Sequence, residues 1–494
     1  MRRIAFMYMM SVLPLLTVTA QVVMPRVLSM GQVVSLAQEN SIAAMGYRNM
    51  YESSFWNWKS YKAGMRPSLS LNAGLANFNR SLVALQDYNT GAISYRSNWN
   101  MNNELTLQLS QNIPWTGGIL SFSASLSRLD QYSPTRETTY YNQPMFLSYS
   151  QSLWGYNGFK WSRQIAPKEY EAARRDYISN MENVSRTAVR YFWDYVYATE
   201  NLEAAHRSYD ESCRLYDAAV SRYGMGLLSY DQLQQMEINV LRDSLDVSSS
   251  ATSLQTALNC LCSYIGYQDN TRLKLVTDYD IPDMNLDYSD VLSRAMENSS
   301  FCISQNIEYL RSMEMVEQSE AGTGPSAYLN ARFGVSGTGR GIKESVSGLQ
   351  NQEVVGLTLG IPLLDWGVGK GRRRMAEAQA QTTRLSIEQN MADFRQELMA
   401  KVIRFNNQRS QCLISKRAAS LAQDSYALAL KNFGSGSMSV LQLEQLKEMS
   451  DNARSQYISS VAAFWDCYFE IRALTLYDYM SGTDIVVEFD RLVR

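Results

Sequence analysis

The sequence predicts an internally duplicated α+β membrane protein, in which amphipathic strands lead into very long helices. Three observations predict this class: an export leader, a second half that repeats the first, and long stretches without glycine or proline. The chain has 494 residues and a net charge of −2. It therefore lacks the basic field of a nucleic-acid-binding protein, and we expect no nucleic-acid partner.

Residues 1–20 have the pattern of a secretory signal peptide. Two arginines precede an apolar run that ends at Leu16, and small residues lead to a cleavage site before Gln21. The short apolar run contains Pro14, which argues against a membrane anchor. No later stretch reaches 18 consecutive apolar residues, so we expect an exported chain without a transmembrane helix.

The chain offers no catalytic or metal-binding constellation. His206 is the single histidine, which excludes a metal site with several histidines. It also leaves no second histidine beyond the one that a catalytic triad would need. The six cysteines show no compact disulfide framework, and Cys260 and Cys262 are too close for a structural zinc site. We expect buried free thiols, no cofactor, no metal and no enzymatic activity.

The chain contains the same order of elements twice, as an internal repeat. Glu39-Asn40-Ser41 recurs as Glu297-Asn298-Ser299, at an offset of 258 (297 − 39). Lys160 recurs as Lys370, at an offset of 210 (370 − 160). The first half therefore carries 48 extra residues (258 − 210), which lie between Pro67 and Leu153. The predicted domains are a first repeat at 21–270, a second repeat at 285–480 and a C-terminal tail at 481–494.

Each half predicts a helix followed by two strands with period-2 alternation, which gives a sheet one apolar and one polar face. The helices are expected at 33–64 and 288–321, the first strands at 68–75 and 327–335, and the second strands at 145–149 and 355–361. The extra residues predict an inserted hairpin at about 100–130, with its turn at 114–118.

Long uninterrupted helices follow the strands. Residues 168–223 and 372–433 contain no glycine or proline, and neither do 227–265 and 437–481. Helices of about 50–60 residues would be about 75–90 Å long, and they need packing along their whole length, as in a coiled coil. A Gly-x-Gly and a serine separate the members of each pair, which predicts two helical hairpins.

The strands suit a lipid-facing barrel with a wet interior. An ordinary half-buried sheet explains the alternation equally well, but the export leader favours the membrane. Four strands, or six if the inserted hairpin joins them, cannot close a barrel from one chain, and open edges are not tolerated in lipid. The chain must then assemble with copies of itself. Tryptophans expected at membrane interfaces are Trp56, Trp58, Trp99, Trp115, Trp154, Trp161 and Trp366.

Four stretches also carry a resemblance to a known family. They are LSMGQVVSLAQENS (28–41), RYGMGLLSYDQLQQME (222–237), VGLTLGIPLLDWGVGKGRRRMAEAQ (355–379) and NFGSGSMSVLQLEQLKE (432–448). With the duplication and its spacing, the sequence resembles the TolC-type outer-membrane efflux channels over nearly the whole chain after the leader. These are the outer membrane factors of tripartite efflux and type I secretion.

The resemblance implies a homotrimer in the outer membrane of a Gram-negative bacterium. Each half would give two strands to a shared 12-stranded barrel, and the helices would form a coiled-coil tunnel that extends into the periplasm. A periplasmic membrane fusion (adaptor) protein would dock at the helix turns and link the channel to an inner-membrane pump of RND or ABC type. Export of small molecules is the first expectation, and type I protein secretion is the alternative.

The resemblance also assigns site residues. It places the adaptor-docking tip at Gly224, Met225, Gly226, Leu227, Gly434, Ser435, Gly436 and Ser437. Some family members close the tunnel with aspartates, and the matching positions here are Gln232, Gln235, Gln442 and Gln445. Glutamines would constrict without a carboxylate field, which puts cation binding at the gate in doubt. Asp231 and Glu444 are sequence neighbours of Gln232 and Gln445, but we expect their side chains on other faces of the helices.

One stretch resembles a phosphate-binding loop and is not one. GVGKG at 367–371 lacks the glycine five residues before Gly369 and the Ser or Thr after Lys370. Its counterpart in the first half contains Lys160, so we interpret both as joints between barrel and tunnel. The predicted junction residues are Leu153, Lys160, Pro362, Trp366, Gly367 and Lys370.

A structural coiled-coil protein of the cell envelope is a remote alternative. It would explain export and long helices, but it would not explain amphipathic strands at the same place in both halves. Extraction distinguishes the two, because a channel stays with outer membranes as a heat-resistant trimer, whereas a coiled-coil protein washes off.

Overall fold

The computed structural model describes residues 27–86, 91–133, 135–267, 273–277, 279–434 and 437–492. The predicted signal peptide, and Ser435 and Gly436 of the second turn, lie outside these residues. The chain divides into two compact units, which cut across the two repeats. We call Ala43–Arg186, Asp283–Gln411 and Ala463–Arg494 the sheet unit, and Met1–Ile42, Thr187–Pro282 and Cys412–Ala462 the hairpin unit.

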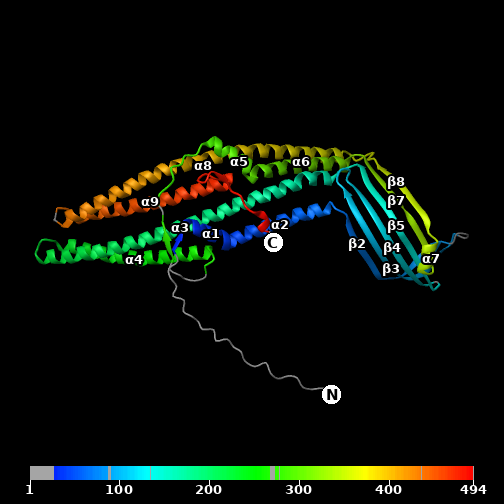
Figure 1. The fold of residues 1–494 in the computed structure, drawn as a ribbon, viewed down its shortest axis with the longest axis horizontal. Coiled ribbons are helices and arrows are strands. Elements are labelled where there is room, and N and C mark those ends of the chain that lie inside the picture. Colours follow the sequence, from blue (N-terminus) through cyan, green and yellow to red (C-terminus); the bar gives the residue numbers. More distant parts are fainter. Residues whose placement is uncertain are drawn as a thin grey trace, which may run out of the picture. The chain divides into compact units, whose positions relative to one another are not determined.

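The sheet unit contains one antiparallel sheet of six strands in the order β2-β3-β4-β5-β7-β8 (Figure 1). The strands are β2 (Ser68–Gln86), β3 (Ile93–Ile113), β4 (Gly118–Ser133), β5 (Glu137–Trp154), β7 (Ser326–Gly339) and β8 (Gln350–Gly360). Within the described residues the outer edges of β2 and β8 have no partner strand. Because every pair of neighbours is antiparallel, β2 and β8 run in opposite directions.

The inserted hairpin joins the sheet as β3 and β4. β3 pairs with β2, β4 pairs with β5, and the turn between β3 and β4 covers residues 114–117. The two-strands-per-half count that the resemblance implied is therefore wrong for the first half, which contributes four strands. The apolar residues of β3 and β4 lie on the same face of the sheet as those of β2 and β5. The hairpin therefore fits inside the sheet, with one face apolar throughout and the other polar.

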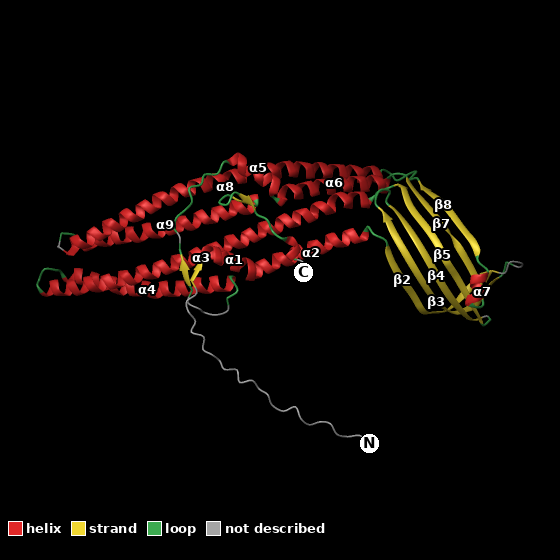
Figure 2. Ribbon diagram, in the orientation of Figure 1, coloured by secondary structure: helices red, strands yellow, loops and turns green. Residues whose placement is uncertain are grey.

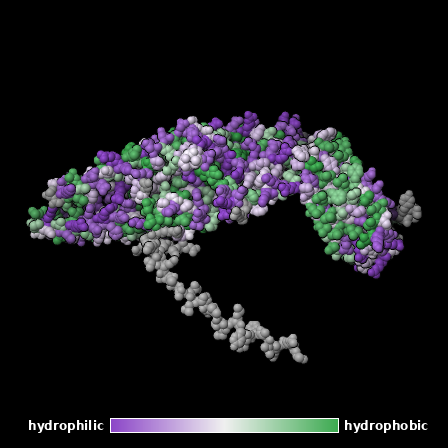
Figure 3. Space-filling view, viewed as in Figure 1, coloured by the Kyte–Doolittle hydropathy of each residue, from purple (hydrophilic) through white to green (hydrophobic). Residues whose placement is uncertain are grey.

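The register aligns the apolar residues on one face. Leu71 of β2 faces Leu107 of β3, which faces Ala124 of β4, and Leu147 of β5 faces Phe333 of β7. Leu71 is 64% exposed and Leu147 is 41% exposed. Figure 3 shows hydrophobic side chains gathered over the strands. The opposite face carries Ser70, Thr106, Gln108, Ser121, Ser148, Asn330 and Thr358.

An aromatic cluster lies on β2, β3 and β4, beyond the leucine rows. Trp99 contacts Phe78 and Tyr132, at ring-centroid distances of 6.2 and 5.4 Å, and the guanidinium of Arg80 lies 5.1 Å from its ring. The cluster has the composition of an interfacial girdle. Three other tryptophans expected at membrane interfaces lie on helices, namely Trp56 and Trp58 on α2 and Trp161 on α3.

The helices recur at the two offsets found in the sequence. α1 (Met30–Asn40) and α5 (Tyr288–Asn298) begin 258 residues apart (288 − 30), as do α2 (Ile42–Gly64) and α6 (Ser300–Thr323). α3 (Gly158–Gly224) and α8 (Val368–Gly434) begin 210 residues apart (368 − 158), as do α4 (Tyr230–Tyr264) and α9 (Val440–Thr475). α3 and α8 each have 67 residues, longer than expected.

Two expectations about the helices were wrong. The expected first helix of each half is broken, because Ser41 and Ser299 adopt extended backbone between two helices. α3 starts before the proline-free stretch and contains Pro167. A proline inside a helix removes one backbone hydrogen bond, so the helix beyond it depends on its packing.

Four helices of the sheet unit make successive lateral contacts. The hydroxyls of Tyr51 on α2 and Tyr170 on α3 lie 3.0 Å apart. Nζ of Lys160 on α3 lies 2.8 Å from a carboxylate oxygen of Glu317 on α6. Phe301 on α6 stacks on Phe394 of α8 with ring centroids 4.5 Å apart. The order of contact is therefore α2-α3-α6-α8.

The C-terminal segment packs into the sheet unit, although it was expected to be a tail. Phe489 contacts Tyr51 and Tyr177, at ring-centroid distances of 5.0 and 6.1 Å. Residues 477–478 and 483–484 form the short strands β9 (Tyr477–Asp478) and β10 (Thr483–Asp484), and residues 489–491 form a 3₁₀ helix. The short α7 (Ile342–Ser347) lies between β7 and β8.

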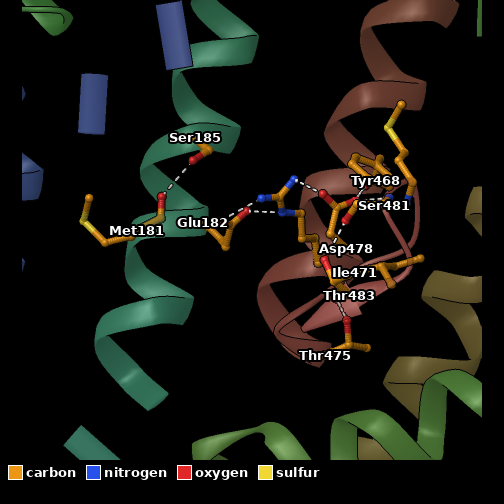
Figure 4. A network of polar contacts seen from close by, with 11 residues as sticks. Met181, Glu182, Ser185, Tyr468, Ile471, Thr475, Asp478, Ser481 and Thr483 are labelled. Atoms are coloured by element: carbon orange, nitrogen blue, oxygen red, sulfur yellow. Dashed lines mark hydrogen bonds and ion pairs between the residues drawn. The ribbon is translucent and has the colours of Figure 1, made fainter. Parts of the chain in front are cut away.

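A buried ionic network ties α3 to this segment. Figure 4 shows Glu182 of α3 together with Tyr468 and Asp478. Nε of Arg472 lies 2.8 Å from Glu182 Oε2, and its Nη1 lies 3.2 Å from Asp478 Oδ2. Tyr468 donates its hydroxyl proton to Asp478. Burial raises the pKa of the Glu182 carboxyl, and the charge of Arg472 only partly offsets this effect.

The hairpin unit pairs β1 (Val27–Ser29) with β6 (Lys274–Val276) in parallel and includes all of α1 and α4 (Figure 2). Among the described residues, no helix is apolar over enough of its length to cross a membrane. All six cysteines are free, but the expectation that they are buried was wrong for Cys260, which is exposed, and for Cys213 and Cys302, which are half-buried.

Candidate docking tip and sheet-to-helix junctions

The first helical hairpin turns at a glycine with left-handed backbone. α3 ends at Gly224, and Gly226 has φ +74°. The N–H of Leu227 donates to the carbonyl of Arg222 at 3.0 Å, and the N–H of Gly226 donates to the carbonyl of Tyr223 at 2.9 Å. These bonds satisfy carbonyls at the helix end, and the positive φ explains why glycine occupies position 226.

The turn presents apolar side chains from a fixed backbone. Met225 is 65% exposed and Leu227 is 71% exposed. α4 begins with a capping box, in which the N–H of Gln232 donates to Ser229 Oγ at 3.3 Å and the N–H of Ser229 donates to Gln232 Oε1 at 3.0 Å. A capped turn with exposed apolar residues is suited to docking a partner.

The second hairpin repeats this chemistry where it is described. α8 ends at Gly434, and the N–H of Ser437 donates to the carbonyl of Asn432 at 3.1 Å. The N–H of Gln442 donates to Ser439 Oγ at 3.4 Å, and the N–H of Ser439 donates to Gln442 Oε1 at 3.2 Å. Both hairpins therefore start their second helix with the same capping box.

The two hairpins are joined below the turns by a small core and a buried carboxylate. Ser212 donates to Asp243 Oδ2 at 2.6 Å, and Nζ of Lys447 lies 2.8 Å from the same oxygen. Since Ser212 is on α3, Asp243 on α4 and Lys447 on α9, this contact links both hairpins. The core cluster consists of Ala219, Met236, Ala429, Phe433 and Leu443.

The four glutamines expected at a constriction are exposed, and two of them have another role. Gln232 and Gln442 form the capping boxes just described. A comparison with family members that have aspartates at these positions does not indicate this capping role. Gln235 donates to Asn239 Oδ1 at 3.4 Å. Asn239 in turn donates to Glu444 of the other hairpin, so Asn239 connects Gln235 to that carboxylate.

At the first sheet-to-helix junction, Asn157 caps α3. Its Oδ1 accepts the N–H of Phe159 at 3.1 Å and the N–H of Lys160 at 3.3 Å. The indole N–H of Trp161 donates to Glu317 Oε2 at 2.9 Å, the oxygen that also binds Lys160. Leu153, the other predicted junction residue, lies near the end of β5 and is half-exposed.

At the second junction, Asp365 caps α8. Its carboxylate accepts the N–H of Gly369 at 2.7 Å and the N–H of Gly367 at 2.9 Å, and these bonds hold its pKa below the usual range. Trp366 and Gly367 have φ values of +54° and +90°, which turn the chain from sheet to helix. The predicted junction residues Pro362, Trp366 and Lys370 are all exposed. Because Asp365 uses the N–H groups of GVGKG, the stretch forms no phosphate cradle.

The sequence interpretation missed a charged cleft in the hairpin unit. Its volume is about 660 Å³, and α3, α8 and α9 line it together with Tyr279. Burial raises the pKa of the Asp451 carboxyl in its wall, although Lys447 and Arg207 are close. Opposite charges such as Arg454 and Glu200 pair across it. Nothing in the sequence indicated it, because its lining comes from segments more than 200 residues apart.

Comparison with known proteins tests the resemblance found in the sequence. Residues 311–462 match the outer membrane efflux protein family. The resemblance to TolC-type channels that the sequence showed is thus confirmed. The part matched begins in α6 and ends in α9, so it includes β7, β8 and all of α8. No curated protein matches the chain in sequence.

Solved structures of outer-membrane channels share the fold over most of the chain. The CmeC outer membrane channel of Campylobacter jejuni is 13% identical, with 94% of this chain and 88% of that chain covered at a TM-score of 0.65. VceC of Vibrio cholerae is 13% identical, with coverages of 92% and 97% and a TM-score of 0.63. The open-state MtrE channel of Neisseria gonorrhoeae is 14% identical, with coverages of 90% and 88% and a TM-score of 0.61. The chain therefore has the α+β fold of outer-membrane efflux channels.

Proposed function

We propose that the chain is the outer-membrane exit duct of a tripartite efflux pump and exports small molecules. The observation that carries this proposal is the six-stranded sheet, which has one exposed apolar face, one polar face and, among the residues that the structure describes, two edges without a partner strand. Such a sheet is unstable in water and incomplete in lipid, but it is complete as part of a barrel. The family match supports efflux as the activity.

The functional unit in this proposal is a homotrimer in the outer membrane of a Gram-negative bacterium, with the helices extending into the periplasm. Six strands per chain give eighteen strands in the trimer rather than the twelve of the plain pattern. Barrel diameter grows roughly linearly with strand number, so the lumen would be about 1.5 times as wide.

The two helix turns form the adaptor-docking tip. Met225 and Leu227 supply exposed apolar contacts, and Gly224, Gly226, Gly434 and Ser437 belong to the turns. Ser435 and Gly436 are included in the tip from the sequence alone. A periplasmic membrane fusion protein would bind there and connect the duct to an inner-membrane pump of RND or ABC type. The matching capping boxes support a tip that presents two similar sites per chain.

The constriction proposed near the tip rests on Gln235 and Gln445, because Gln232 and Gln442 hold the helix starts. Glutamine side chains offer neutral donors and acceptors, so a carboxylate field near the constriction would come from Glu444, which Asn239 connects to Gln235.

The lumen favours neutral or mixed cargo. The polar face of the sheet is mainly Ser, Thr, Asn and Gln, and it carries few charges, such as Glu104 and Arg332. A transport conduit needs no catalytic group, which agrees with a chain that is not an enzyme. The two extra strands keep type I protein secretion as the second candidate, since a wider lumen would suit a polypeptide.

Deletion of the gene, with complementation, tests the proposal. We expect intracellular accumulation of a fluorescent efflux substrate in the deletion strain, and its reversal by the wild-type chain. Co-purification from membranes should bring an adaptor and a pump. Normal dye efflux together with loss of a secreted protein from the medium would favour type I secretion. A salt-washable protein, with neither defect, would contradict both functions.

A further inference from the structure

The short helix α7 packs on the apolar face of the sheet, at the end of the strands away from α2 and α6 (Figure 1). Gly337 and Gly339 of β7 continue the alternate positions of Phe333 and Val335, which lie on that face. A Cβ at Gly337 would meet the backbone of Ser345 on α7, and a Cβ at Gly339 would lie 2.7 Å from the Ser345 nitrogen. Glycine at both positions therefore allows the helix backbone to lie directly on the strand.

One side of α7 faces the sheet, and the other sides are exposed. Ser345 is fully buried, whereas Ile342 and Val346, which are four residues apart and share a side of the helix, are 52% and 48% exposed. Lys343 is also exposed. At about 3.6 residues per turn, Lys343 lies nearly opposite to Ser345, on the side away from the sheet. α7 thus presents hydrocarbon and a cation together.

A second cation, Arg128 of β4, lies on the same face as α7. It pairs with Tyr140 of β5, and Tyr140 pairs with Gly339. The Arg128 guanidinium lies 5.9 Å from the Tyr140 ring. Its Nε and Nη2 donate to Asp130 Oδ1 at 3.2 and 3.0 Å, and its side chain is still 50% exposed. Because these bonds use two of its three nitrogens, Nη1 can donate to a further acceptor.

Arg128 marks the level at which the apolar face ends. Two residues earlier, Leu126 pairs with Leu105 in the leucine rows, and beyond Arg128 lie Trp99 and the exposed Arg80. Hydrophilic residues border the hydrophobic patch at this end of the strands (Figure 3). An exposed cation on a lipid-facing surface is costly at the bilayer centre and well tolerated at the interface. In the proposed barrel this end is the interface on the side away from the periplasm, because the helices leave the sheet at the other end.

We propose that Arg128 and Lys343 bind the phosphate groups of a phosphorylated outer-leaflet lipid, whose acyl chains contact Ile342 and Val346 of α7. Arginine offers a planar fork to phosphate oxygens, and lysine offers a point charge on a flexible stem. The hydrocarbon beside both cations favours a phosphate carried by a lipid over a free phosphate ion. The choice of leaflet rests on the proposed function, whereas the phosphate site rests on the faces of β4, β5, β7 and α7.

Lipid binding by the purified full chain in dodecyl maltoside micelles tests the site. The probe is lipid A with its two phosphates, the comparison is the same lipid without them, and native mass spectrometry counts the bound lipids. We expect the phosphorylated form to bind on the order of tenfold more tightly. Equal binding of the two forms would overturn the proposal. Displacement of lipid A by an equal concentration of inorganic pyrophosphate would show a site for free phosphate and would also overturn it.

Substitution of the two cations locates the site. Lys343→Gln and Arg128→Gln should each remove most of the preference for the phosphorylated lipid. Since Arg128 is a partner of the buried Asp130, Arg128→Gln is also made together with Asp130→Asn, which leaves no unpaired carboxylate there. The matched control is Arg332→Gln on the polar face of β7, which should keep the full preference. A preference that survives the loss of both cations, or that Arg332→Gln abolishes as well, would refute the assignment.

Photocross-linking in whole cells tests the face on which α7 lies. The photoreactive residue p-benzoylphenylalanine at position 346 should form adducts that carry acyl chains. In place of Thr338, which is exposed on the opposite face of β7, it should form none. Absence of lipid adducts at position 346 would place α7 away from lipid and overturn the proposal.

The lipid site and the proposed function fail independently. Dye efflux is measured separately, in the deletion strain. Phosphate-dependent lipid binding without an efflux defect on deletion refutes the function alone. An efflux defect without phosphate-dependent binding refutes the lipid site alone.

Discussion

Arg186 of α3 and Asp466 of α9 form a two-pronged ion pair in the sheet unit, with Nε–Oδ1 and Nη2–Oδ2 distances both of 2.7 Å. Both side chains are about one-third exposed, at 31% and 36%. The pair joins the first repeat to the last helix of the second. Its fork geometry favours arginine specifically.

Replacing Arg186 by Lys should therefore weaken the contact although the charge is kept. We expect a loss of about 1 kcal/mol, because partial exposure screens the pair. Asp466→Asn should cost a similar amount, and the double variant should cost less than the sum. Thermal unfolding of the purified protein measures the cycle, and strict additivity would show that the pair contributes nothing.

The orientation of the inserted hairpin is tested by two neighbouring residues of β3. Leu107 lies on the apolar face and Gln108 on the polar face. Leu107→Arg should impair folding into lipid vesicles by about 2–4 kcal/mol if that site is near the bilayer midplane, because it places a charge in hydrocarbon. Gln108→Arg is the matched control and should fold normally. Equal effects of the two variants would refute the assignment of faces.

Backbone strain should dominate substitutions in the first turn. A Cβ at Gly226 would meet nothing within 4 Å, so its φ of +74° is the only obstacle. Gly226→Val should destabilise the hairpin by about 1–2 kcal/mol, whereas Gly226→Asn should be tolerated, because asparagine accepts left-handed backbone. Gly224→Ala is the control, since that residue is helical. Hydrogen exchange at the amides of residues 219–236 measures the effect. Unchanged exchange rates in the Gly226→Val variant would contradict the prediction of backbone strain.

Acid should weaken the C-terminal packing through Asp478. Burial opposes ionisation of this carboxyl, but hydrogen bonds from Tyr468 and the Met480 N–H, with the charge of Arg472, outweigh it and lower the pKa. The stabilisation is present above the unfolded pKa of about 3.9 and is lost as the pH falls through the lowered value. Asp478→Asn should reduce the fall of the melting temperature below about pH 4. If the melting temperature of the variant falls as steeply with acid as that of the wild type, Asp478 is not the group responsible.

Glu182 should act in the opposite direction. Its pKa is raised by burial, so its contribution is complete below the unfolded value of about 4.3 and declines as the pH rises through the raised value. Glu182→Gln should reduce the change in melting midpoint between pH 4 and 7, while Arg472 keeps Asp478 as partner. Ser185→Ala, one turn along α3, is the control and should leave that change unaltered.

The sequence predicted those features that depend on periodicity and composition. The two offsets, the strand alternation and the glycine turns all follow from local pattern, and the helices of the structure begin at the same spacings. The place of the inserted hairpin could not be predicted, because it depends on the pairing of β3 with β2 and of β4 with β5. Its alternation is equally compatible with a separate surface hairpin.

Other features were visible but not used. Ser41 and Ser299 lie within the tripeptide that revealed the 258-residue offset, and a serine after asparagine is a reason to end one helix and start another. The glutamines were compared with aspartates of the family, whereas the serine three residues before Gln232 and Gln442 indicated capping. The ionic network of Glu182, Arg472 and Asp478 has no sequence signal, because its members meet only through folding.

The position of the added hairpin has a consequence for how such a channel can evolve. β3 and β4 lie between β2 and β5, in the interior of the sheet, and both outer strands are those that the two repeats share. In the barrel proposed above, an internal hairpin would lengthen the perimeter by two strands per subunit and would leave the outer strands and the helical hairpins unaltered. In such a barrel the pore diameter could change by duplication or loss of hairpins, while the surfaces that contact other proteins stay the same.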